Sequence, residues 1–172
     1  MSLETRLCER LRGRVVVVGI GNPAAGDDAA GTLLAGLLSA GGDVRVIVAE
    51  DVPESHLGSI TSWWPDSVLL IDAVDLGAET GAVALLRPDD ITGRSASTHR
   101  VPLDLLGEVI ERESSAEVSV LAIQPGSTAV GSPRSKEVTA AVQALATLLG
   151  DLLARQAPGP VDASAGRRER RC

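Results

Sequence analysis

Three polar residues that are far apart in the chain have the side-chain types of a catalytic or metal-binding site. Asp28 belongs to a glycine-rich turn, Asp72 directly follows an apolar run, and His99 precedes Pro102 in a loop. Two carboxylates and one imidazole form a donor set that suits manganese, nickel, zinc or iron. Three protein ligands leave a coordination position open for a substrate or water, as in metal sites that do chemistry. The residue types are therefore compatible with a metal site.

Each of these residues also has an interpretation that needs no ligand. Asp27 and Asp28 stand at the predicted start of a helix, where a carboxylate caps free amides and interacts favourably with the helix dipole. A lone loop histidine such as His99 is more often structural or exposed, and His56 is interpreted as a surface residue. Asp72 is harder to explain in this way, because it places a charge at the rim of a buried sheet.

The glycine-rich turn also allows a nucleotide-binding interpretation. It fits the dinucleotide pattern G-x-G-x-x-A through Gly19, Gly21 and Ala24. In such folds, however, the pyrophosphate lies at the helix N-terminus, and here Asp27 and Asp28 occupy that place. Two carboxylates repel a diphosphate, so the pattern disfavours a nucleotide and favours a cation.

The elements that must position these residues alternate between strands and helices. Apolar, β-branched runs predict strands at residues 14–20, 44–48, 68–71, 82–86 and 118–123. Helical periodicity predicts helices at residues 28–38, 102–110 and 136–155. The connection from Asp72 to the fourth strand is shorter than the roughly 10–12 residues of a parallel crossover, so that strand should run antiparallel to the third. The prediction is a three-layer αβα sandwich around a mostly parallel, five-stranded twisted sheet with one antiparallel strand.

This topology places the candidate catalytic and metal-binding residues at one edge of the sheet. In open α/β sheets, ligands bind beyond the carboxyl ends of the strands. Asp28 follows the first strand, Asp72 the third and His99 the fourth, and these residues gather at that edge together with Asp27 and Asp75.

The composition excludes several classes of protein. The chain has 172 residues, a formal charge of −7, two Trp, and no Phe or Tyr. It therefore lacks the cationic surface and stacking platforms by which proteins bind nucleic acids. No apolar run approaches the roughly 20 residues of a membrane span, and the first residues have no apolar signal region. We expect a cytoplasmic, monomeric protein with neither nucleic acid nor membrane as a partner.

Residues 1–155 are expected to form a single α/β domain, since domains most often contain about 100–150 residues. Residues 156–172 are rich in Pro, Gly, Ala and Arg, which is typical of a disordered tail. Cys8 and Cys172 are too few for a disulfide framework or a zinc cluster.

Several motifs, taken together and in order, resemble those of the nickel–iron hydrogenase maturation endopeptidases. They are the glycine turn 19–22 with 26–28 and Gly31, the segment 69–77, the segment 98–103, and the segment 123–125. The resemblance is closest to the formate-hydrogenlyase branch of the family and covers about residues 14–153.

The resemblance implies an endopeptidase that removes the C-terminal extension of a hydrogenase large-subunit precursor after nickel insertion. By position, Asp28, Asp72 and His99 would recognise the nickel and carry the catalysis. The nickel would be supplied by the nickel-loaded precursor and not stored in the enzyme. Whether the metal or a carboxylate (Asp28 or Asp72) activates the attacking water stays open. The alternatives are another metal-assisted hydrolase at the same edge, a Rossmann-like nucleotide-binding domain, or a catalytically silent binding protein.

Overall fold

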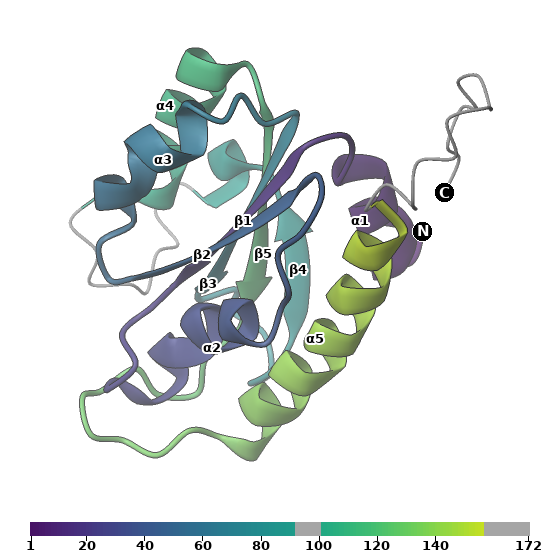
Figure 1. Ribbon diagram of the computed structural model, residues 1–172. Helices are drawn as coiled ribbons and strands as arrows, with labels where there is room; N and C mark the ends of the chain where they lie inside the picture. The colour runs from purple at the N-terminus through teal and green to yellow at the C-terminus, as the bar shows by residue number, and fades with distance from the viewer. Residues whose placement is uncertain (92–100, 157–172) are drawn as a thin grey trace.

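In the part of the chain that the structure describes, the sheet has five strands, as predicted. The computed structural model describes residues 1–91 and 101–156. The strand order is β2-β1-β3-β5-β4, in which the first four strands are parallel and β4 is antiparallel to β5 (Figure 1). The strands are β1 (Val15–Ile20), β2 (Val44–Glu50), β3 (Ser67–Ala73), β4 (Val83–Leu86) and β5 (Glu117–Ile123).

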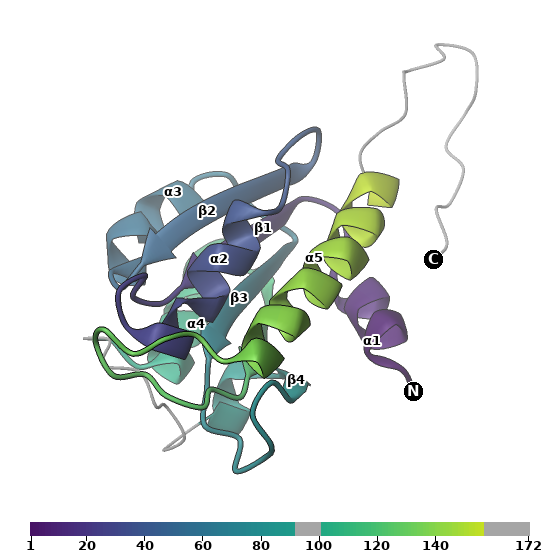
Figure 2. The ribbon, with the colours of Figure 1, turned by 90° about the horizontal axis from the view of Figure 1, so that it is seen from below.

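Helices cover both faces of the sheet and complete the predicted three layers (Figure 2). One face carries α1 (Leu3–Arg10), α2 (Ala30–Gly36) and α5 (Lys136–Gln156), and the other carries α3 (Leu57–Thr61) and α4 (Leu103–Ser114). Short 3₁₀ helices, η1 (Gly26–Ala29), η2 (Pro53–His56) and η3 (Pro88–Ile91), lie in the connections.

The continuous apolar strands are explained by burial on both faces. Every residue of β1 and β3 is buried. Val15 and Val17 pack in the core on the α2 and α5 side, whereas Val16 and Val18 pack in the core on the α3 and α4 side. Alternate residues of a strand point to opposite faces, so one run of valines supplies both cores.

The helix after the glycine turn differs from the prediction. The sequence predicts one helix ending at the pair Gly41-Gly42, but the first turn is the 3₁₀ helix η1 and α2 already ends at Gly36. Leu37, predicted to face the core, is 60% exposed. Gly31 and Gly36 lower the helix propensity of this segment, which favours a short helix.

Two strands also differ in detail from the prediction. Asp72 does not follow its strand but lies within β3, opposite Ala122 of β5. β4 has the predicted direction, but it pairs with β5, which lies between β3 and β4. Sequence spacing indicates the direction of a strand, whereas its neighbour depends on where a later strand inserts.

One helix corrects the expectation about apolar runs. Within the described part of the chain, the segment Lys136–Arg155 of α5 is long and apolar enough to cross a membrane, by length and composition only. In the structure its apolar stripe packs into the core on the α2 side of the sheet, through Val138, Val142, Leu145, Leu149 and Leu152.

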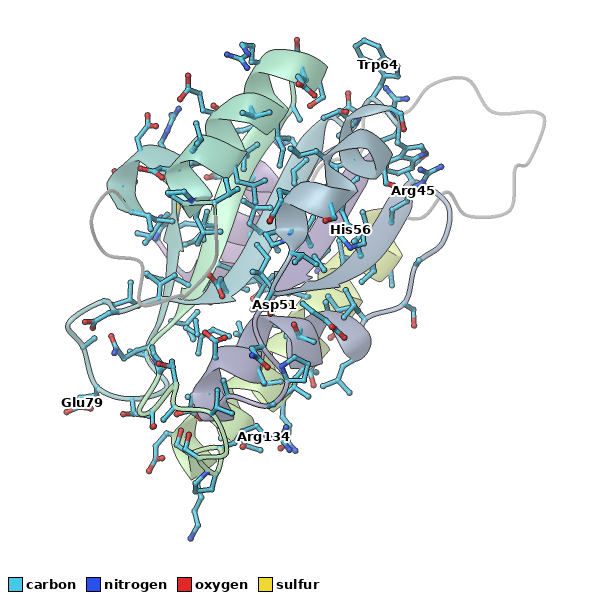
Figure 3. The ribbon with its side chains drawn as sticks, turned by 90° about the vertical axis from the view of Figure 1, so that its left-hand side faces the viewer. Arg45, Asp51, His56, Trp64, Glu79 and Arg134 are labelled. Atoms are coloured by element: carbon cyan, nitrogen blue, oxygen red, sulfur yellow. The ribbon has the colours of Figure 1, made fainter. Side chains whose placement is uncertain are left out.

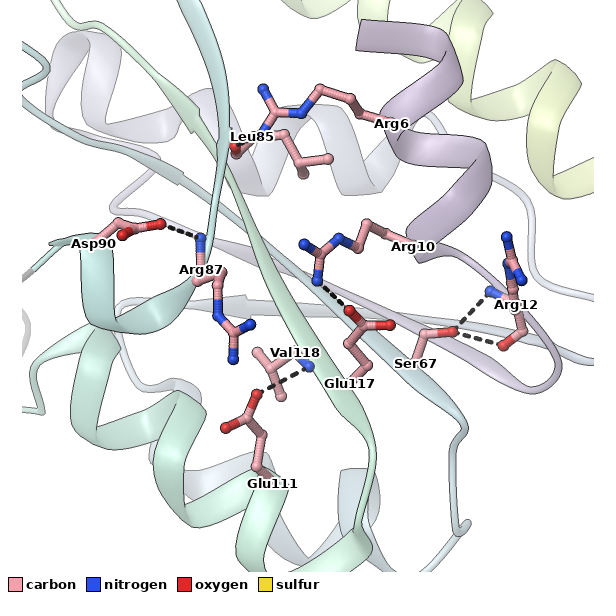
Figure 4. Close-up of polar contacts among 10 residues, drawn as sticks. All are labelled: Arg6, Arg10, Arg12, Ser67, Leu85, Arg87, Asp90, Glu111, Glu117 and Val118. Atoms are coloured by element: carbon pink, nitrogen blue, oxygen red, sulfur yellow. Dashed lines mark hydrogen bonds and ion pairs between the residues drawn. The ribbon is translucent and has the colours of Figure 1, made fainter. Parts of the chain in front are cut away.

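Helix α1, which the sequence analysis did not predict, lies beside the edge strand β4 (Figure 4). Arg6 of α1 donates a hydrogen bond to the backbone carbonyl of Leu85, and Arg10 pairs with Glu117 of β5. After α1, the Ser67 hydroxyl bonds to the amide and the carbonyl of Arg12 at 2.8 and 2.6 Å. The N-terminal segment therefore covers one margin of the sheet.

Candidate active site

The turn after β1 holds Asp28 against the end of the sheet. Gly21 has a φ of +132°, and a Cβ atom there would lie 1.7 Å from the carbonyl oxygen of Asp28. Only glycine permits this conformation and this close approach. The amide of Asn22 donates to Oδ2 of Asp28 at 2.9 Å, and Asp28 is 2% exposed. The turn thereby buries and orients the Asp28 carboxylate.

Asp72 lies on the neighbouring strand and is fully buried. Its Oδ1 accepts a hydrogen bond from the amide of Ala73 at 2.8 Å. A Cβ atom at Gly31 of α2 would lie 2.1 Å from the carbonyl oxygen of Ile71 and 2.3 Å from that of Ile20. The start of α2 therefore touches the ends of both strands, which brings Asp28 and Asp72 to the same edge as predicted.

Asp27, adjacent in sequence, has a different task. Its Oδ2 accepts from the amides of Gly126 and Ser127 at 2.8 and 3.3 Å, and its Oδ1 accepts from the amide of Ser135 at 2.8 Å. Burial raises the pKa of Asp27, but hydrogen bonds from Ser135, Gly126 and Ser127 outweigh burial and leave the pKa below its ordinary value of 3.8. Asp27 does not cap its own helix, and it holds the β5–α5 loop.

Asp75, which the sequence analysis grouped with the acidic edge, belongs to a second loop contact. Oε1 of Gln124 accepts from the amides of Leu76 and Ala78 at 2.6 and 3.3 Å, while its Nε2 donates to Oδ1 of Asp75 at 3.2 Å. Gln124 thus binds the β3–β4 loop to the end of β5. Two of the four predicted acidic residues, Asp27 and Asp75, therefore serve loop structure.

The third predicted ligand, His99, lies outside the described residues. The structure therefore brings together Asp28 and Asp72 only. Among residues 1–91 and 101–156, no group of three or more His, Cys, Asp or Glu side chains is placed to hold a metal ion. His56, predicted on the surface, is half-buried in η2.

Glu54, a further carboxylate near this edge, was not among the site residues predicted from the sequence. Glu54 lies in η2, which follows β2 directly. Its Oε2 is buried and has no hydrogen-bond partner among the residues that the structure describes. The available signal was an acidic residue shortly after a strand end, in a connection interpreted only as polar.

Figure 3 shows the two ends of the sheet. Asp51, Glu79 and Arg134 project from the connections that follow β2, β3 and β5, while Arg45 and Trp64 lie toward the opposite end. The Arg45 guanidinium carbon lies 4.5 Å from the ring centre of Trp63. The carboxyl edge therefore has charged side chains of both signs in its connections.

The glycine turn does not have the free amides that a diphosphate requires. Its amides donate to groups of the protein itself, at Gly21, Asn22, Ala24, Ala25, Asp27 and Asp28. A phosphate-binding turn points several free amides at its ligand. The geometry therefore argues against the nucleotide-binding alternative.

The fold and the site define a three-layer α/β domain with two buried carboxylates at the carboxyl edge of its sheet. Residues 32–151 match the family model described as "HycI: Hydrogenase maturation protease". The chain belongs to the hydrogenase maturation protease family, and it is accordingly a peptidase. The matched residues include Asp72 and His99 and begin shortly after Asp28.

Individual relatives agree with this assignment. The chain is 34% identical over 131 residues to the hydrogenase 3 maturation protease of Escherichia coli K12, covering 74% of this chain and 83% of the relative. It is 28% identical over 135 residues to a putative hydrogenase maturation protease of Methanocaldococcus jannaschii, covering 72% and 80%. The crystal structure of the [NiFe] hydrogenase maturation protease HycI from Thermococcus kodakarensis KOD1 superimposes with a TM-score of 0.79 at 32% identity, covering 87% of this chain and 99% of that one. The resemblance stated from the motifs is confirmed.

Proposed function

We propose that this chain is an endopeptidase that removes the C-terminal extension of a nickel–iron hydrogenase large-subunit precursor after nickel has been inserted. In this proposal Asp28, Asp72 and His99 recognise the nickel that the substrate carries. The observation that supports it is the burial of Asp28 and Asp72, 2% and 0% exposed, at one sheet edge of a peptidase-family chain. We expect the enzyme to act as a monomer in the cytoplasm.

The electrostatics of two buried carboxylates favour a cation. A buried carboxylate group is costly unless positive or hydrogen-bonding partners surround it, and a divalent cation bound by both side chains would be such a partner. One backbone amide orients each carboxylate, from Asn22 for Asp28 and from Ala73 for Asp72. Their donor atoms are therefore held in place before the substrate arrives.

Nickel borne by the substrate would make cleavage conditional on metal loading. Contacts from Asp28, Asp72 and His99 to that nickel would hold the scissile bond of the precursor beside the same carboxylates. Two routes to the attacking water fit these residues: activation by the metal, or proton removal by Asp28 or Asp72. Both routes require at least one of the two carboxylates.

A cleavage assay on purified nickel-loaded and nickel-free precursor tests the proposal. We expect processing of the loaded precursor only. Asp28→Ala, Asp72→Asn and His99→Ala should each lower the rate by at least about 100-fold, because each removes a metal contact or the catalytic base. Asp151→Asn, an exposed carboxylate on α5, and His56→Ala are matched controls that should retain the wild-type rate.

Three results would contradict the proposal. Equal processing of loaded and nickel-free precursor would exclude nickel recognition. Wild-type rates in Asp72→Asn and His99→Ala would exclude the site. A stoichiometric metal ion in the chain purified without substrate would indicate a resident-metal hydrolase instead.

A further inference from the structure

The two edge strands of the sheet, β4 and β2, differ in how far other parts of the chain cover them. On β4, the backbone carbonyl of Leu85 accepts a hydrogen bond from Arg6, and α1 lies beside the strand. The opposite edge is β2, whose only strand neighbour among the described residues is β1. Proteins usually protect sheet edges, because unpaired backbone groups bind other extended chains.

The backbone pairing of β2 shows which groups face outward. The amide of Val15 donates to the carbonyl of Asp43 at 2.8 Å, so the register turns the backbone groups of Arg45 and Ile47 toward β1. The alternate residues Val44, Val46 and Val48 point theirs away from the sheet. Val44 is paired with Gly41 through two bonds of 3.0 Å. Among the described residues, the outward amides and carbonyls of Val46 and Val48 have no partner.

The side chains along this edge are mostly apolar. Val48 and the following Val52 are 43% and 40% exposed. The charges of the strand lie at Arg45, which stacks on Trp63 near the beginning of the strand, and at Glu50, where the strand ends. The stretch between them has none of the charges or prolines that commonly keep edge strands from pairing.

The edge is continuous with the candidate active site. The carbonyl of Glu50, the last residue of β2, accepts from the amide of Gly21 at 2.8 Å. The next residue, Asn22, orients Asp28. A strand added along β2 would therefore run toward the two buried carboxylates. Strand addition supplies backbone hydrogen bonds for any sequence, while alternate side chains supply selectivity.

We propose that the outward backbone of Val46 and Val48, the β2 docking edge, binds an extended segment of the polypeptide substrate as a sixth strand. The proposal rests on the endopeptidase function proposed above, since a peptidase must hold a stretch of extended backbone near the bond that it cuts. It does not depend on nickel recognition by Asp28, Asp72 and His99.

Val48→Pro tests the docking edge directly. Proline removes the outward amide of Val48 and leaves the bonds between β1 and β2 in place, since proline is tolerated on edge strands where the amide faces outward. We expect KM for the nickel-loaded precursor to rise about tenfold, the effect of one lost hydrogen bond, with kcat little changed. Val48→Thr keeps the amide and the β-branched shape, and it should retain the wild-type KM. Cleavage by Val48→Pro with the wild-type KM would overturn the proposal.

Hydrogen exchange of the full chain provides a readout that does not require the proline variant to fold. In the chain alone, the amides of Val46 and Val48 should exchange faster than those of Arg45 and Ile47. Adding a saturating concentration of the nickel-free precursor to the wild-type chain, which should bind it through the docking edge without cleaving it, should slow exchange at Val46 and Val48. Unchanged exchange at both residues would overturn the proposal, whereas failure of wild-type cleavage would overturn the endopeptidase function instead. The proposal would also be overturned if the chain formed a dimer that Val48→Pro dissociated while KM stayed unchanged. In that case a second copy of the chain would occupy the β2 docking edge.

Discussion

Asp27 and Asp28 show how adjacent, equally buried carboxylates acquire different tasks. They are 1% and 2% exposed, yet Asp27 accepts three backbone amides from the β5–α5 loop and Asp28 accepts one from Asn22. Amides that point at a carboxylate stabilise its charged form. The structure therefore stabilises the charged form of Asp27 as part of the loop, whereas for Asp28 we propose a cation as a further partner.

Replacing Asp27 with Asn should destabilise the fold by about 1–3 kcal/mol near neutral pH, because an amide group cannot accept all three bonds. The pKa of Asp27 is lowered from 3.8, so its contribution is fully present above about pH 4 and is lost as pH falls through the lowered folded pKa. The difference in unfolding free energy between wild type and Asp27→Asn should therefore shrink in acid. Urea unfolding at several pH values measures it.

Asp151→Asn, which changes an exposed carboxylate on α5, is the matched control and should unfold like the wild type at every pH. A difference between wild type and Asp27→Asn that stayed constant from neutral pH down to strong acid would contradict the assigned role of the Asp27 charge.

At the scale of elements, glycines determine how closely η1 and α2 approach the strands. Gly31 allows the start of α2 to contact the carbonyls of Ile20 and Ile71, and Gly21 allows the turn to fold back on Asp28. A side chain at either position would separate the turn from the sheet. The pattern that resembles a dinucleotide motif is thus explained by packing between elements.

Gly21→Ala should cost about 3 kcal/mol or more and should also reduce cleavage, because the new Cβ displaces the backbone of Asp28. Gly36→Ala is the matched control: its Cβ would meet nothing within 4 Å, and alanine there should be neutral or stabilise by up to about 1 kcal/mol. Thermal unfolding of both variants tests this pair. A Gly21→Ala protein with the wild-type Tm would refute the packing argument.

At the scale of the whole molecule, the sheet separates two apolar cores, and α5 contributes a long stripe to one of them. This packing accounts for the apolar composition of α5 by contact with the sheet. The N-terminal helix α1 packs Leu7 into the same core and covers the β4 edge, which leaves β2 as the open edge.

Leu149→Ala should lower the free energy of unfolding by about 2–5 kcal/mol, because Leu149 is fully buried and its truncation leaves a cavity. Leu105→Ala on α4, where the side chain is 48% exposed, should change it by no more than about 0.5 kcal/mol. Denaturant unfolding of the two variants compares them. Equal stability would mean that α5 does not pack on the sheet in solution.

The type and order of the elements were largely predictable, because the signals are local. Each signal lies within a short segment of the sequence: the valine run of β1, the apolar stripe of α5 and the short connection before β4. The end of α2 was not predictable from periodicity alone. Leu37 continues the apolar stripe, yet it is exposed because the helix stops one residue earlier.

The sequence by itself determined the five strands and their directions, and hence the shared edge of Asp28 and Asp72. Only the tertiary structure decided that Asp27 and Asp75 serve loops, that β5 inserts between β3 and β4, and that β2 is the open edge. The bonds of Asp27 reach residues 99 to 108 positions away. The sequence shows that a buried carboxylate would need hydrogen-bond partners. Which residues become those partners depends on segments that are distant in the chain and meet only in the folded protein.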